Sequence, residues 1–145
     1  VQVQIVRFCM FKTRRNKYSN KKVTIDGHKF DSQAEAKHYY FTLKPALERG
    51  EIRNLELQPR IRCEINGKKV CDYLADFRYL SSTKIGPQGQ IGCQVVEDVK
   101  GYKTDIYKLK KKLVEALYPG TVIVEISGSP YRQMTLPEPS PSEQT

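Results

Sequence analysis

The stretch Val95–Lys112, "VVEDVKGYKTDIYKLKKK", joins a strand-like run of residues to a segment crowded with lysines. Its first part predicts a central strand, because its apolar residues are nearly continuous. Asp98 and Lys100 lie two residues apart and therefore project to the same face of that strand. Since a buried strand rarely keeps charged side chains without partners, these two charges require a chemical explanation.

Around this strand, the sequence predicts one further helix and three further strands. The segment 104–120 predicts a helix, and "TVIVEI" at 121–126 predicts a strand. Upstream, "LELQPRIRCEI" (55–65) and "KKVCDYLADFRYL" (68–80) predict antiparallel strands that meet at Asn66-Gly67, a strong hairpin turn signal. The helix has an apolar stripe, spaced by three and four residues, that consists of Ile106, Leu109, Leu113 and Leu117.

The N-terminal half predicts a small hairpin and a helix. "KVTIDGHKF" (22–30) alternates around the turn Asp26-Gly27. The segment 31–50, "DSQAEAKHYYFTLKPALERG", predicts a helix with Ser32 as its N-cap. Pro45 lies inside this pattern, so we expect a kink just before it or a short second helix from there. The apolar stripe of this helix is expected to be Ala36, Tyr40, Leu43 and Leu47.

The order helix, three strands, helix, strand predicts an α/β fold with a central, mixed four-stranded sheet flanked by helices. A helical crossover then connects the third strand to the fourth. We expect one domain over residues 23–126, preceded by a flexible basic arm at 1–22. Residues 127–145 contain four prolines among polar residues and predict a disordered or extended tail.

The distribution of charge indicates a polyanionic partner. The chain has 145 residues and a formal net charge of +9. Residues 1–30 contain eight Lys or Arg and one Asp, and residues 99–112 contain six Lys and one Asp. The remainder contains eleven Lys or Arg and fourteen Asp or Glu, so the positive charge is confined to two segments. A single cationic run is usually solvated surface, but two such segments favour nucleic acid.

The cysteines do not indicate a structural metal or a disulfide. None of the four forms a CxxC pair, which disfavours a zinc site. In simple hairpin register, Cys63 faces Val70 and Cys71 faces Arg62, which places the two thiols on opposite faces. We therefore expect free thiols, as in a reducing cytoplasm. No stretch is apolar enough for a membrane span, and residues 1–9 are interpreted as sequence upstream of Met10 rather than a secretory signal.

Acidic side chains are expected to converge at one end of the sheet. If the second and third strands pair with their ends together, Asp76 meets Asp98. Two neighbouring carboxylates repel unless a cation lies between them, and Mg²⁺ with its preference for oxygen ligands suits that position. The alternative is an exposed ion pair with no chemical role. Glu35 fits either the same cluster or a capping box, because Ser32-Gln-Ala-Glu35 has the S-x-x-E spacing.

Helical Glu35, Asp76 in "LADF" and the run Asp98-Val99-Lys100 together resemble the PD-(D/E)XK nuclease superfamily. Four blocks, "NKYSNKKVTIDGHKFDSQAEAKHYY", "LELQPRI", "YLADFRY" and "VVEDVKGYKT", resemble small phage-encoded nucleases related to Holliday-junction resolvases. The resemblance covers residues 16–126 and implies a restriction-endonuclease-like core. Ala75 replaces the proline of the superfamily motif, and the third motif fits either Asp98-x-Lys100 or Glu97-x-x-Lys100, of which only Asp98 shares the face of Lys100.

The resemblance also implies roles for individual residues. Asp76, Asp98 and the Val99 carbonyl are expected to bind Mg²⁺ or Mn²⁺, Lys100 to position or activate water, and Glu35 to contact the metal site. Gln58, Tyr102 and Tyr107 are lesser candidates at its border. The lysines and arginines expected to hold the DNA backbone are Arg14, Arg15, Lys17, Lys21, Lys22, Lys103, Lys108, Lys110, Lys111 and Lys112.

The expected function is therefore metal-dependent endonuclease activity on branched DNA, such as a Holliday junction, in phage recombination or DNA processing. A resolvase nicks two strands symmetrically, which implies a homodimer, and a phage protein would act in the cytoplasm of a bacterial host. Two alternatives remain: a restriction-type or transposon-type nuclease, and a non-catalytic DNA-binding module on a nuclease-like fold. The set of Asp76, Asp98 and Lys100 disfavours the second, since a binding module does not need acids beside phosphates.

Overall fold

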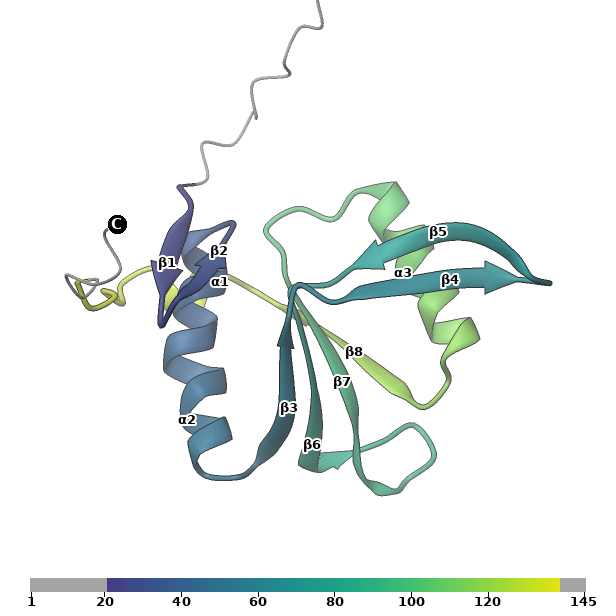
Figure 1. Ribbon diagram of the computed structural model, residues 1–145, viewed down its shortest axis with the longest axis horizontal. Helices are drawn as coiled ribbons and strands as arrows, with labels where there is room; N and C mark the ends of the chain where they lie inside the picture. Colours follow the sequence, from purple (N-terminus) through teal and green to yellow (C-terminus); the bar gives the residue numbers. More distant parts are fainter. Residues whose placement is uncertain (1–20, 139–145) are drawn as a thin grey trace, which may run out of the picture.

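The computed structural model describes residues 21–138 of the chain (Figure 1). Most of the predicted N-terminal arm, including Arg14, Arg15 and Lys17, lies outside these residues. The elements follow the order β1 (Val23–Ile25), β2 (His28–Phe30), α1 (Gln33–His38), the π-helical turn η1 (Tyr39–Leu43), α2 (Lys44–Glu48), β3 (Ile52–Leu57), β4 (Arg60–Ile65), β5 (Lys68–Leu74), β6 (Phe77–Ile85), β7 (Ile91–Val99), α3 (Asp105–Leu117), β8 (Thr121–Ile126) and the 3₁₀ turn η2 (Ser129–Tyr131).

The fold is α/β, as predicted, with a mixed four-stranded sheet in the order β3-β6-β7-β8. The pairs β3–β6 and β6–β7 are antiparallel, and β7 pairs with β8 in parallel. The last connection needs a crossover, which α3 provides. The segment α1–η1–α2 lies on one side of the sheet, and α3 with the β4–β5 hairpin lies on the other (Figure 1). The apolar strand β7 is central, as its sequence predicts.

The two long strands predicted over 55–65 and 68–80 are each divided in two. Their halves near the turn form the separate β4–β5 hairpin, whereas their other halves, β3 and β6, join the main sheet. The chain bends at Gln58, which has a positive φ of 51°, and at Asp76 on the opposite strand. Backbone hydrogen bonds from Gln58 to Asp76 (2.8 Å) and from Ala75 to Pro59 (3.1 Å) continue the pairing through the bend.

The register of the β4–β5 hairpin differs from the simple prediction. Cys63 lies directly opposite Cys71, and Glu64 lies opposite Lys69, so Val70 is an extra residue in β5. This β-bulge shifts the pairing by one residue and brings both thiols to the same side of the hairpin. The expectation that they point to opposite faces is therefore wrong. The cysteines of the described chain are free, as expected.

The first helical segment contains a π-helical turn between α1 and α2. Ser32 caps α1 as predicted, because its side chain accepts a hydrogen bond from the Glu35 amide. The irregularity expected near Pro45 takes the form of η1, which precedes this residue. A π turn does not keep the α-helical period, so the predicted stripe is partly wrong. The buried apolar residues are Ala36, Tyr39, Leu43 and Ala46, and Leu47 is 42% exposed.

The predicted apolar stripe of α3 is also partly wrong. Val114 is fully buried, and Tyr107, Leu113 and Leu117 pack against the same core. Ile106 and Leu109, by contrast, are each 68% exposed. The β4–β5 hairpin explains the difference, because it covers the side of α3 that carries Tyr107 and Val114 rather than the side that helical spacing alone favours.

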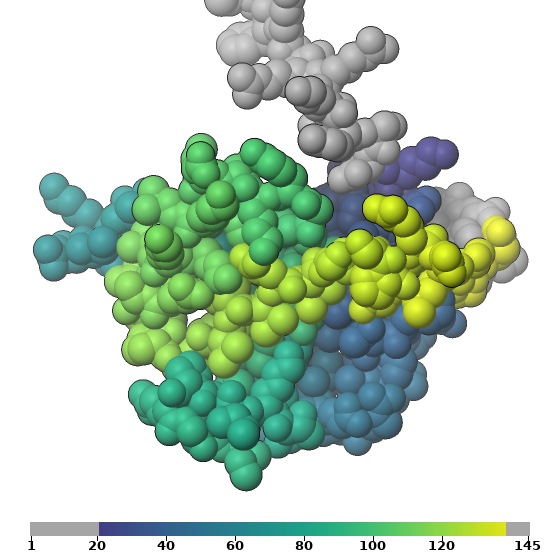
Figure 2. All heavy atoms as spheres, turned by 180° about the vertical axis from the view of Figure 1, so that it is seen from behind, coloured from purple at the N-terminus to yellow at the C-terminus, as the bar shows by residue number. Residues whose placement is uncertain are grey.

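The predicted tail begins with a packed segment. Residues 127–138, which we call the C-terminal segment, run from the end of β8 across the first helical segment (Figure 2). Tyr131 in η2 is buried, and its hydroxyl lies 2.8 Å from Thr42 Oγ1 and 2.7 Å from His38 Nδ1. The expectation of a disordered or extended tail from residue 127 is therefore wrong at its start, because an aromatic ring anchors this part to the helix.

A buried polar network links the helix, the sheet and the C-terminal segment. His38 donates from Nε2 to Glu97 Oε2 at 2.6 Å, and Tyr79 donates to Glu97 Oε1 at 2.6 Å. Burial of Glu97 raises the pKa of this carboxyl, but the hydrogen bonds from His38 and Tyr79 outweigh burial and hold the pKa below its ordinary value. Glu97 and His38 are only 3% and 2% exposed, so their mutual pairing is what makes their burial tolerable.

We predict that Glu97→Gln lowers the free energy of unfolding at pH 7 by about 1–3 kcal/mol, because His38 and Tyr79 lose the carboxylate that accepts their buried hydrogen bonds. A carboxyl with a lowered pKa stabilises the fold above its unfolded pKa, so the difference from wild type narrows only below about pH 4. Urea unfolding at several pH values measures both effects. The control Glu51→Gln removes an exposed, solvent-screened pair with Arg49 and leaves the urea midpoint close to that of wild type. Equal losses for the two variants would contradict the prediction.

Candidate active site

The strand register brings Asp76 beside Asp98, as the sequence predicts. Phe77 is paired with Glu97 across β6 and β7, and the Asp76 amide donates to the Glu97 carbonyl at 3.1 Å. The two aspartates therefore lie next to each other at the ends of neighbouring strands. Asp76 occupies the bend between β5 and β6, so the cluster lies where the β4–β5 hairpin separates from the main sheet.

Lys100 joins the two aspartates. Its Nζ lies 3.6 Å from Asp76 Oδ2 and 3.5 Å from Asp98 Oδ1. Asp98 and Lys100 share one face of the chain, as their spacing predicts. Because a single ammonium group contacts both carboxylates, it offsets part of their mutual repulsion.

Asp98 is the most deeply buried member of this cluster, with no exposed surface. Tyr73 donates a hydrogen bond to its Oδ2, and the Tyr107 hydroxyl lies 3.3 Å from the same oxygen. Within residues 21–138, Oδ1 is buried without a hydrogen-bond partner, although Lys100 is close to it. A buried carboxylate oxygen without a hydrogen-bond donor is costly, and this oxygen keeps its capacity to accept a hydrogen bond or bind a cation on the side of Lys100.

Asp76 is held by the backbone of the neighbouring strand. The Val99 amide donates to Asp76 Oδ2 at 2.7 Å. Burial raises the pKa of Asp76 above its ordinary value, and the opposing effects of Lys100 and the Val99 amide do not fully offset it. A carboxyl in this condition gains from any additional cation, because a nearby positive charge favours its ionised form.

Glu35 takes both roles that its spacing in the sequence allowed: it caps a helix and it lies near the acidic cluster. Its amide donates to Ser32 Oγ at 3.2 Å, and its carboxylate accepts from Ser32 Oγ at 2.8 Å and from the Asp31 amide at 3.3 Å. Burial raises the pKa of this carboxyl to about 6, with a further contribution from the negative charge of Asp76. Glu35 therefore caps α1 and also lies within electrostatic reach of the aspartate cluster.

The alternative motif with Glu97 does not fit the geometry. Glu97 projects to the side of the first helical segment, where His38 and Tyr79 occupy its oxygens. Asp98, the next residue, projects to the opposite side with Lys100. Of the two acids in "EDVK", only Asp98 therefore lies with Asp76 and Lys100.

The residues present can hold a hard divalent cation. The described residues contain no group of three or more His, Cys, Asp or Glu side chains arranged for a metal ion. Mg²⁺ does not need such a group, because it commonly binds one or two carboxylates and fills its other positions with water and substrate phosphate. Asp76 and the unpartnered oxygen of Asp98 provide two carboxylates of this kind.

The predicted DNA-binding lysines around α3 are only partly available. Lys103 and Lys111 both pair with Glu125. These contacts lower the pKa of the Glu125 carboxyl to about 2, and the hydrogen bond from Lys103 has the largest effect. Lys108 pairs with Asp105, and Lys110 donates to the Asp72 carbonyl. Lys112 on α3 and Lys21 before β1 are exposed, and Lys22, also exposed, lies 3.9 Å from Asp31 Oδ1.

Sequence reasoning missed Tyr73 and did not settle Gln58. Tyr73 is almost fully buried and donates to Asp98, a contact that the spacing of residues in this stretch does not signal. Gln58 is exposed at the bend, and its amide group lies 3.4 Å from Asp31 Oδ2. Of the predicted border residues, Tyr107 contacts Asp98, whereas Tyr102 is 77% exposed.

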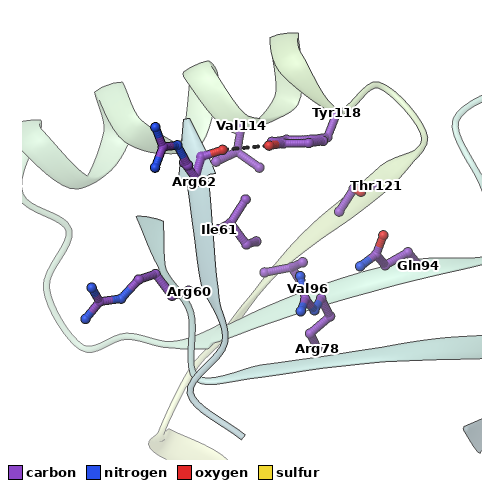
Figure 3. Close-up of a pocket in the computed structure, with 9 residues that line it drawn as sticks. All are labelled: Arg60, Ile61, Arg62, Arg78, Gln94, Val96, Val114, Tyr118 and Thr121. Carbon is purple, nitrogen blue, oxygen red and sulfur yellow. Dashed lines mark hydrogen bonds between the residues drawn. The ribbon is translucent and has the colours of Figure 1, made fainter. Parts of the chain in front are cut away.

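A cavity of about 160 Å³ lies away from this cluster, between the hairpin, the sheet and the C-terminal end of α3 (Figure 3). Ile61, Val96 and Val114 form its apolar part, and Tyr118 donates to the Arg62 carbonyl at its rim. None of the predicted metal-binding or catalytic residues lines it. Among the described helices, none is long and apolar enough to cross a membrane.

Comparison with known proteins identifies a family without an assigned activity. No curated protein and no solved structure significantly matches the chain. A family model described as "Protein of unknown function (DUF1064)" matches residues 15–130, which include the aspartate cluster and the start of the C-terminal segment. The chain therefore belongs to the DUF1064 family.

Proposed function

We propose that the chain is a metal-dependent DNA endonuclease that hydrolyses phosphodiester bonds in branched DNA, on a restriction-endonuclease-like core. One observation carries the proposal: Asp76, Asp98 and Lys100 meet at the ends of β6 and β7, and a buried oxygen of Asp98 has no hydrogen-bond partner within residues 21–138. A purely structural ion pair does not need a second buried carboxylate. An acid pair with a lysine does suit a site that handles a phosphate group.

Asp76 and Asp98, with the Val99 carbonyl, would hold Mg²⁺ or Mn²⁺ at this position. The cation would stabilise charge on the phosphate and lower the pKa of water. Two carboxylates and one carbonyl leave room for water and a phosphate oxygen, which is the usual composition of such a site.

The side chains of this site have separable tasks. Tyr73 and Tyr107 donate to Asp98 and fix the orientation of its carboxylate. The Val99 amide does the same for Asp76. Lys100 would donate to a phosphate oxygen and stabilise the negative charge that develops there. Glu35, with a pKa of about 6, would orient the attacking water or accept its proton.

DNA is the substrate favoured by the charge of the chain. The net charge of +9 draws polyanions to the surface, and exposed Lys21, Lys22 and Lys112 are suited to contact phosphates without reading bases. Resolution of a four-way junction requires two nicks, so the active form would be a homodimer.

We predict that Asp76→Asn and Asp98→Asn each abolish cleavage of labelled four-way junctions, flaps and duplex DNA in Mg²⁺ or Mn²⁺. Binding to the same DNA in EDTA stays similar or becomes tighter, because each change removes a negative charge near phosphate. The control Asp105→Asn removes an exposed acid at the start of α3 and keeps wild-type cleavage. Full metal-dependent cleavage by both site variants would exclude this site, provided that thermal unfolding shows all variants to be folded.

A second prediction separates the two roles of Glu35. Glu35→Gln keeps a capping side chain, so its thermal midpoint stays within a few degrees of wild type, equivalent to about 1 kcal/mol or less. Its cleavage rate falls at least ~100-fold if the carboxylate acts in the site. Glu48→Gln is the matched control: it makes the same substitution at an exposed acid of α2, so both the thermal midpoint and cleavage stay close to wild type. Normal cleavage by Glu35→Gln would restrict Glu35 to capping.

A further inference from the structure

A groove leads away from Lys100 between the first helical segment and the C-terminal segment. Its first part, of about 450 Å³, is lined by residues of α1, by Lys100-Gly101 and by residues 127–132. An adjoining part of about 380 Å³ continues along the C-terminal segment to Leu136. Both parts share Gln33, Lys37 and Arg132, so they form one continuous groove.

The walls of this groove are fixed by contacts on both sides. At its head, the Lys100 amide donates to the Ile126 carbonyl at 3.0 Å, which joins the site to the end of β8. Farther along, Tyr131 is anchored to His38 and Thr42. A Cβ at Gly128 would lie 3.3 Å from the Ala34 Cβ, so the C-terminal segment lies close against α1. The groove therefore exists before any ligand binds, which reduces the entropic cost of binding.

The lining of the groove is cationic, and within the described residues Lys100 is the one of its three cations that is paired with carboxylates. Its lining includes Lys37, Lys100 and Arg132, and no Asp or Glu. Within the described chain, Lys37 and Arg132 form no ion pair, whereas Lys103 and Lys111 beside α3 share Glu125. Cations that gather in a concave surface without a carboxylate partner favour an anionic ligand. The remaining polar side chains that can donate hydrogen bonds to phosphate oxygens are Gln33, Ser127, Ser129, Gln133 and Thr135, whereas the Tyr131 hydroxyl is already bound to His38 and Thr42.

We propose that this groove binds the phosphate backbone of the DNA strand adjacent to the scissile phosphate, with Lys37 and Arg132 as its phosphate ligands. The inference rests on the proposed function and adds to it a path for the substrate strand. Lys100 links the two regions, because it lies at the head of the groove and also contacts both aspartates. A strand whose scissile phosphate meets Lys100 would continue over Lys37 and Arg132.

The test compares two double variants of the full chain that lose the same charge. Lys37→Gln/Arg132→Gln removes the two groove cations. Arg53→Gln/Lys68→Gln removes one arginine and one lysine that are exposed on the edge strand β3 and at the tip of the β4–β5 hairpin. The hairpin tip and the C-terminal segment lie at opposite ends of the molecule (Figures 1 and 2). Binding of labelled duplex and four-way junction is measured in EDTA from about 50 to 200 mM salt.

We expect the groove variant to bind DNA on the order of tenfold or more weakly, and its slope of log K against log salt to flatten by about 1 to 2. The control variant keeps a DNA affinity and a salt slope close to those of wild type. In cleavage assays the groove variant raises KM with little change in kcat, because these contacts lie outside the reacting atoms. If Lys37→Gln impairs folding, Arg132→Gln alone, at an exposed residue, is tested for about half of the slope change.

The outcomes separate this proposal from the proposed function. Equal affinities and salt slopes for the groove and control variants would overturn the groove, even if wild type cleaves DNA. Wild type that binds but cleaves no DNA would overturn the nuclease, and the salt slopes would still decide the groove.

Discussion

The burial of two consecutive carboxylates on the central strand is the constraint on which the rest of the structure depends. Glu97 and Asp98 project to opposite faces of β7, and each is almost completely removed from water. Such burial is tolerable only if the layer that covers each face of β7 provides hydrogen-bond partners for the acid on that face. The helical layer provides His38 for Glu97, whereas Tyr73 from the hairpin and Tyr107 from α3 serve Asp98.

The two acids differ in how many of their carboxylate oxygens have hydrogen-bond partners among the described residues. Both oxygens of Glu97 have hydrogen-bond partners, so this residue links the helix to the sheet. Among the described residues, Asp98 accepts hydrogen bonds at Oδ2 only, and its other oxygen is directed toward Lys100 and the bend that carries Asp76. The same strand thus joins a closed network on one face to an open cluster of charges on the other.

Local patterns in the sequence predicted much of this arrangement. The period of two residues along β7 placed Asp98 with Lys100, and the Asp-Gly and Asn-Gly turns located both hairpins. What could not be predicted depends on single inserted or packed residues. The bulge at Val70 and the π turn η1 each shift the side chains by one position, and neither follows from residue type. The C-terminal segment was missed because one aromatic residue, Tyr131, anchors an otherwise polar sequence.

The bend at Gln58 and Asp76 has a consequence for where this fold accepts changes in chain length. The β4–β5 hairpin lies outside the four-stranded sheet, so residues added at Asn66-Gly67 extend the hairpin without altering the pairing of β6 with β7. One residue added between Asp76 and β6 would instead turn every side chain of that strand to the opposite face. The hairpin tip is therefore the natural insertion point for a tag or a guest peptide, and the bend is the point that must keep its length.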